Sequence, residues 1–80
     1  MSTEAVETQL QDIFRDVIGV PDFVLTREMV TGAHPYWNSI ANVEILIRSE
    51  ERWGFEFNMA EIDRIRSFGD LADAIAAKIG

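Results

Sequence analysis

Few side chains in this sequence could take part in covalent chemistry. The chain has no cysteine and one histidine, His34, so disulfides and thiolate zinc sites are excluded and an ordinary zinc site lacks ligands. The hydroxyl of most interest is that of Ser39, which stands where a helix is expected to begin. His34 lies five residues earlier in a loop, and no acidic residue is evident to orient it as a base. We therefore interpret His34 as a surface loop residue and predict that the chain is not an enzyme.

The position expected for Ser39 suits an attached anionic group. A residue at a helix start lies beside backbone N–H groups that have no helical acceptor, and the helix dipole favours negative charge there. A negatively charged group on the Ser39 hydroxyl would therefore sit in a compatible field. A serine at such a place is most often a simple helix cap, so this residue alone leaves both interpretations open.

Composition limits the partners that the chain could have. Its 80 residues make one domain, residues 1–80, and its formal net charge is −7 at pH 7. This charge opposes phosphate backbones, so nucleic-acid binding is not expected, whereas basic partner proteins are favoured. No apolar run reaches the roughly 20 residues needed to cross a bilayer, and the N-terminal residues do not resemble a signal peptide. We expect a cytoplasmic protein without membrane insertion, and nothing demands more than a monomer.

Hydrophobic spacing predicts a first helix and a long loop after it. Apolar residues recur at helical intervals over residues 4–18, and Gly19 and Pro21 mark the end of the helix. Residues 20–37 show no sustained period, although a short turn is expected from Thr26. A loop of this length in so small a domain is usually functional or disordered.

The second helix is expected to begin at Asn38 and Ser39 and to run to about Trp53, before Gly54. Its apolar residues cover more of the helical wheel than a surface helix needs, and they fall into two groups separated by Glu50. We predict that one group faces the core: Ile45, Leu46 and Trp53. The other would form a partly exposed patch typical of a protein-contact surface: Ile40, Val43 and Ile47. The alternative is that both groups belong to the core.

An extended connector and a short third helix are expected next. Residues 55–57 read Phe-Glu-Phe, and Asn58 with Glu61 forms a capping pair that can start the helix. Its buried side would consist of Ile62 and Ile65.

Ser67 and Asp70 repeat this start signal for a fourth helix that ends at Gly80. Its apolar stripe is Phe68, Leu71, Ala72, Ile75 and Ile79. The predicted fold class is therefore all-α, a small four-helix bundle with a long first loop and a short third helix.

The segment from residue 38 to residue 47 resembles the Asp-Ser-Leu segment and helix two of acyl carrier proteins. Ser39 matches the modified serine of that family, and Ile40 the aliphatic residue after it. Val43 matches as well, and Glu44 matches the glutamate five positions after the serine. The order and lengths of the expected helices follow the family along nearly the whole chain.

The resemblance implies a carrier whose Ser39 bears a 4′-phosphopantetheine arm, attached by a phosphopantetheinyl transferase. Acyl groups, as in fatty acid or polyketide biosynthesis, would be held on this arm as thioesters. Acyl-transferring, synthase or ligase enzymes would dock on the second helix, where the implied contact residues are Asn38, Ile40, Val43, Glu44, Ile47 and Glu51. Two alternatives stay open, a peptidyl or aminoacyl carrier with the same arm and an unmodified carrier-like interaction domain.

The chain departs from the family pattern around this helix. Asn38 and Ala41 replace acidic residues, and Arg48 and Arg52 add positive charge to a mostly acidic face. Asn caps a helix as well as Asp does, so the lost charge bears on recognition by the transferase rather than on the fold. Glu44 and Arg48 are four residues apart and are expected to pair.

Two aromatic residues, Tyr36 and Trp37, come just before this segment. We expect Trp37 to pack the loop onto the second helix, the alternative being that the two rings cover the end of the bundle or shield an acyl chain.

Overall fold

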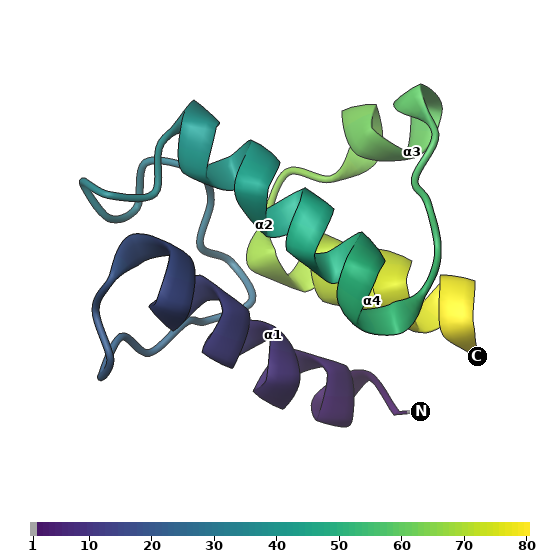
Figure 1. The fold of residues 1–80 in the computed structure, drawn as a ribbon, viewed down its shortest axis with the longest axis horizontal. Helices are drawn as coiled ribbons and strands as arrows, with labels where there is room; N and C mark the ends of the chain where they lie inside the picture. The colour runs from purple at the N-terminus through teal and green to yellow at the C-terminus, as the bar shows by residue number, and fades with distance from the viewer. Residues whose placement is uncertain (1) are drawn as a thin grey trace.

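The computed structural model describes residues 2–80 as four helices that are joined by one long loop and two short connections (Figure 1). In chain order these helices are α1 (Thr3–Ile18), α2 (Ser39–Trp53), α3 (Met59–Arg64) and α4 (Phe68–Ile79). Helix α1 packs against both α2 and α4. The all-α fold class, the long first loop and the short third helix agree with the sequence prediction. None of the helices in the described part is long and apolar enough to cross a membrane.

The ends of the helices lie where the sequence signals place them. Helix α1 ends at Gly19, whose φ of 74° is left-handed and whose N–H donates to the Arg15 carbonyl. Helix α3 begins with the predicted capping box, in which the side chains of Asn58 and Glu61 each accept a hydrogen bond from the other's backbone N–H. Ser67 caps α4 by accepting from the N–H of Asp70, 3.1 Å away. Local capping therefore determines most of the helix boundaries.

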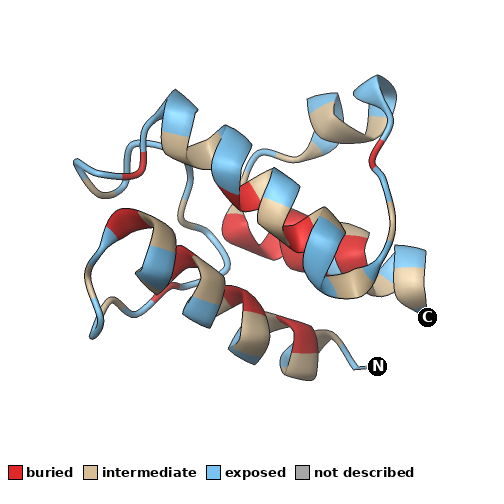
Figure 2. Cartoon of the chain, in the orientation of Figure 1, coloured by how far each residue is buried: buried red, intermediate tan, exposed pale blue. Residues whose placement is uncertain are grey.

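The core lies between α1, α2 and α4. Figure 2 shows buried residues along the inner sides of these helices. On α1 they recur every four residues and are Val6, Leu10, Phe14 and Ile18. The Phe14 ring meets the rings of Trp37 and Phe68 edge to face, with centroids 4.9 and 5.5 Å apart. Burying a side chain of this size stabilises a fold by roughly 1.5–3 kcal/mol. Phe14 thus joins α1, α4 and the end of the long loop.

The long loop is ordered because it is anchored at the start of α4. The carbonyl groups of Arg27 and Met29 accept hydrogen bonds from the N–H groups of Gly69 and Phe68, at 3.0 and 2.8 Å. The Arg27 guanidinium also pairs with Glu7 of α1, and it lies 2.6 Å from Asp73 of α4. These hydrogen-bonded carboxylates raise the pKa of Arg27, with Asp73 the larger cause.

The turn predicted from Thr26 is present, since the Met29 N–H donates to the Thr26 carbonyl at 3.1 Å. The prediction for α3 holds only in part. Ile62 and Ile65 pack against the core, but both are half-buried, and Ile65 lies just beyond the end of the helix. Six residues make fewer than two helical turns, which leaves this helix little surface to bury.

Candidate functional site

Ser39 is the first residue of α2, and it is exposed. Asn38 precedes it in extended conformation, and its side-chain oxygen accepts a hydrogen bond from the N–H of Ala41 at 2.9 Å. The cap of α2 is therefore Asn38, and the interpretation of Ser39 as the cap is wrong. Within residues 2–80, no group hydrogen-bonds to the Ser39 hydroxyl. The fold thus presents this hydroxyl to solvent at a helix start.

The field at this helix start favours negative charge. The first turn of α2 contains no acidic residue, so no carboxylate of that turn offsets the helix dipole. The first backbone N–H groups of a helix have no helical acceptor and are available to an anion. A phosphate ester on the Ser39 oxygen would be compatible with these surroundings.

The loop before Ser39 is fixed by Trp37. This side chain is 2% exposed, and its ring lies against Phe14 of α1. Its indole N–H donates to the side-chain oxygen of Asn42 on α2 at 3.1 Å. The prediction that Trp37 packs the loop onto the second helix is confirmed. Tyr36, in contrast, is 63% exposed.

His34 lies within its own loop and not on the open surface. It is half-buried, and its ring lies 5.0 Å from that of Phe23 and 5.4 Å from that of Tyr36, measured between centroids. Its Nδ1 accepts a hydrogen bond from the Tyr36 N–H at 3.1 Å. The interpretation of His34 as a surface loop residue therefore needs correction, because the ring helps to hold the loop together.

One side of α2 is apolar and exposed. Ile40, Val43 and Ile47 are 82, 56 and 49% exposed, and we call these three residues the apolar face. On the other side Ile45 is buried, while Leu46 and Trp53 are half-buried and pack against the core. The alternative in which both groups belong to the core is therefore wrong. An exposed apolar patch of this kind is typical of a contact surface.

The two arginines of α2 both have partners on α1. Arg48 lies 3.3 Å from the Glu44 carboxylate, the predicted pair, and it also binds Asp16 of α1. The hydrogen bond to Asp16 is the main cause that raises the pKa of Arg48. Arg52 hydrogen-bonds to Gln9 of α1. Both arginines thus connect α2 to α1.

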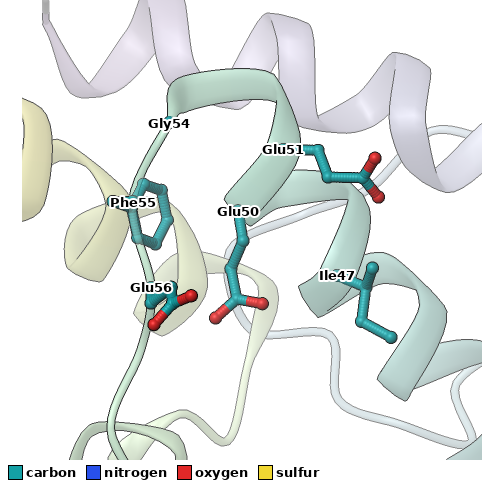
Figure 3. A pocket seen from close by; sticks show the side chains of 6 residues that line it. All are labelled: Ile47, Glu50, Glu51, Gly54, Phe55 and Glu56. Atoms are coloured by element: carbon teal, nitrogen blue, oxygen red, sulfur yellow. The ribbon is translucent and has the colours of Figure 1, made fainter.

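A hollow of about 670 Å³ lies at the far end of α2 (Figure 3). We call it the α2 hollow, and its lining is Ile47, Glu50, Glu51, Gly54, Phe55 and Glu56. The contact residues implied by the family resemblance include only two of these, Ile47 and Glu51. Phe55 and Glu56 follow the helix, and the signal that could have found them is Gly54, which marks a reversal of the chain. No group of three or more acidic, histidine or cysteine side chains in the described residues could hold a metal ion.

Two known proteins resemble this chain over most of its length. An acyl carrier protein of Acidothermus cellulolyticus is 28% identical over 76 residues, which cover 95% of this chain and 90% of that protein. The solution NMR structure of a holo acyl carrier protein from Geobacter metallireducens has a TM-score of 0.84 and 29% identity, covering 91% of this chain and 84% of that one. No family model matches the sequence.

Proposed function

We propose that this chain is a member of the acyl carrier protein family, which its similarity to two such proteins supports, and that Ser39 bears a 4′-phosphopantetheine arm. A member of this family is a carrier protein and not an enzyme, as the sequence predicted. The structural relative is a holo protein, which supports an arm in the family, and the attachment residue is our proposal for this chain.

The observation that carries the proposal is the division of roles between Asn38 and Ser39. Asn38 caps the helix through its side chain, which leaves the exposed Ser39 oxygen available for modification. A serine that capped the helix would have its oxygen engaged with a backbone N–H. Ser39 therefore combines a helix-start position with an accessible hydroxyl.

The surroundings of Ser39 fit the arm. The arm would be linked through a phosphodiester on the Ser39 oxygen, where the open N-terminus of α2 stabilises negative charge. When bound, the arm supplies a thiol that holds acyl groups as thioesters. The chain has no cysteine, so its own residues position the arm and do not compete as thiols.

Partner enzymes would recognise the α2 surface next to Ser39. The apolar face supplies contact area that the fold leaves uncovered. Asn38 lies at one end of this face, and Glu44 and Glu51 are exposed on the same helix. We propose that a phosphopantetheinyl transferase and acyl-transferring, synthase or ligase enzymes dock here.

Loading in vitro tests the attachment residue. The purified chain is incubated with coenzyme A and a broad-specificity phosphopantetheinyl transferase, and its intact mass is measured. We expect the mass to increase by one phosphopantetheine. Ser39→Ala should abolish the increase, whereas Ser2→Ala, which changes another exposed serine at a helix start, should not. An increase that survives Ser39→Ala, or none with any such transferase, would contradict the proposal.

The intact mass of protein from its native source identifies the cargo. An arm with an acyl group is the outcome that we expect. An amino acid on the arm would indicate a peptidyl or aminoacyl carrier instead. Native protein without an arm would favour an interaction domain, for which the uncharged residues Asn38 and Ala41 are the structural argument.

A further inference from the structure

The side-chain amide of Asn42 on α2 has its oxygen engaged and its NH2 group free. The oxygen accepts a hydrogen bond from the Trp37 indole N–H at 3.1 Å. Because an indole N–H can only donate, the oxygen of the amide faces Trp37 and the NH2 group faces elsewhere. Among the described residues, none accepts a hydrogen bond from this NH2 group. The amide therefore has N–H donors available to a group from outside the chain.

The orientation of this amide is fixed because Trp37 is fixed. The Trp37 side chain is 2% exposed, and its ring lies edge to face against Phe14. Its backbone is held as well, since its N–H donates to the His34 carbonyl at 2.9 Å and its carbonyl accepts from the Gly32 N–H at 2.8 Å. Turning the Asn42 amide over would set its NH2 group against the buried indole N–H and leave that donor without an acceptor, which is unfavourable.

Helical spacing brings the Asn42 side chain beside Ser39. The two residues are three apart on α2, and residues at this spacing are neighbours on a helix surface, with Cβ atoms about 5–6 Å apart. Side chains of a helix also lean toward its N-terminus. The Asn42 amide accordingly reaches back toward the first turn, where it meets Trp37. A phosphate on the Ser39 oxygen would extend over the same part of the surface.

We propose that the Asn42 side-chain NH2 group donates a hydrogen bond to the phosphodiester that joins the arm to Ser39, and that Trp37 is the positioning residue that orients this group. The inference rests on the carrier function proposed above and adds a side-chain contact for the phosphate of the arm. A hydrogen bond to an ionised acceptor is roughly twice as strong as one between neutral groups. The contact would therefore fix the direction in which the arm leaves α2.

Asn38 also has a free NH2 group, but it does not share a side of α2 with Ser39. Its oxygen accepts from the Ala41 N–H at 2.9 Å, and no described residue accepts from its NH2 group. Asn38 comes directly before Ser39, and adjacent residues do not face each other on a helix. Asn42, at a spacing of three, does. Asn38 is therefore a matched comparison for the test.

Nitrogen–proton correlation NMR of the side-chain amides tests the contact on the full chain. Spectra are recorded before and after loading with coenzyme A and a phosphopantetheinyl transferase, with the Asn38 and Asn58 amides as references. We expect an Asn42 NH2 proton signal to move downfield on loading, by more than any signal of the two references. Trp37→Phe keeps a ring against Phe14 but removes the indole donor. It should reduce this shift by about twofold or more, since the amide is then free to turn over.

The phosphorus signal of the loaded chain gives a second readout. Asn42→Asp keeps an acceptor for the Trp37 indole N–H but replaces the NH2 group with a charged oxygen. Asn38→Asp makes the same replacement on the other side of Ser39 and keeps the acceptor for the Ala41 N–H. We expect the phosphorus shift to change more with Asn42→Asp than with Asn38→Asp. Equal changes, or Asn42 protons that do not move on loading, would overturn the contact, and an undiminished shift in Trp37→Phe would overturn the role of Trp37.

A chain synthesised with phosphoserine at position 39 separates this contact from the carrier function. Its phosphate is present without a transferase, and the Asn42 NH2 signal should move downfield relative to the unmodified chain. Loading that fails while the phosphoserine chain shows this shift would contradict the carrier function and support the contact. Loading that succeeds without a shift would contradict the contact alone.

Discussion

Helices α2 and α4 begin in the same way but in different surroundings. Each is capped by the side chain of a small polar residue in extended conformation, Asn38 or Ser67. At α4, the carbonyls of Arg27 and Met29 cover the first N–H groups. At α2, the described residues supply no such cover, and Ser39 is exposed.

This difference shows that a capped helix start is accessible to another group only where the rest of the chain leaves it open. The start of α4 also carries its own carboxylate, Asp70, which accepts a hydrogen bond from the Arg66 N–H at 3.1 Å. At the start of α4, groups of the chain itself therefore accept from the backbone N–H groups and place a negative charge near the positive end of the helix dipole. At the start of α2 the Asn38 side chain accepts from one N–H group, that of Ala41, and the first turn has no carboxylate. This arrangement suits an attached phosphate.

The largest effect expected from this comparison concerns the second residue of each helix. A Cβ atom at Gly69 of α4 would lie 3.0 Å from both the Cβ and the carbonyl oxygen of Arg27. Gly69→Ala should therefore lower the free energy of unfolding by about 1–2 kcal/mol, because overpacking outweighs the gain in helix propensity. Urea unfolding measures this change.

The matched variant at α2 is Ile40→Ala. This side chain is 82% exposed, and its removal should change stability by no more than about 0.5 kcal/mol. Equal losses from the two variants would contradict the distinction between a covered helix start and an open one.

The two caps should contribute equally to stability although only the start of α2 is exposed. Asn38→Ala and Ser67→Ala each remove a side-chain acceptor for a backbone N–H. Each should cost about 1 kcal/mol in urea unfolding. Asn38→Asp keeps the acceptor and should retain stability. A much smaller loss at Asn38 than at Ser67 would indicate that another group, such as the Ser39 hydroxyl, can cap α2.

The start of α3 extends the comparison with a smaller, pH-dependent effect. A hydrogen bond from Lys78, 2.8 Å away, is the main cause that lowers the pKa of Glu61 below its ordinary value of 4.5, and the bond from the Asn58 N–H adds to it. The unfolded chain therefore binds more protons than the folded chain just below pH 4.5. The stabilising contribution is complete above that pH and is lost as the pH falls through the lowered pKa.

Glu61→Gln should reduce this part of the pH dependence of unfolding between neutral and acidic pH. Glu28→Gln, at an exposed residue of the long loop, is the control and should leave it unchanged. Identical pH profiles for the native chain and Glu61→Gln would show that the contacts to Lys78 and Asn58 do not stabilise the folded state.

Local sequence signals predicted the helices well because caps and apolar stripes act over a few residues. Gly19, Gly54 and Asn58 each mark a boundary that the structure contains. The same signals could not distinguish Ser39 from Ser67. Whether a helix start is covered depends on the Arg27 and Met29 carbonyls, which come from a loop far away in the sequence.

Local sequence signals also could not predict parts of the candidate contact surface. The exposure of Ile40 and Val43 followed from the excess of apolar residues on the helical wheel, but that pattern also allowed a fully buried helix. Glu56 comes next to Glu50 only because the chain reverses at Gly54. The pairing of Arg48 with Asp16 depends on how α1 packs against α2.

The hydrogen bond between Trp37 and Asn42 has a mechanical consequence. It ties the last part of the loop to the second turn of α2, while Asn38 ties the intervening residues to the first turn. Ser39 is therefore held in a fixed position relative to α2. A group attached to its hydroxyl would start at a constant distance from the helix surface. A protein bound to α2 would therefore fix the point from which a group on Ser39 extends, and the remaining freedom of that group would lie in its own bonds.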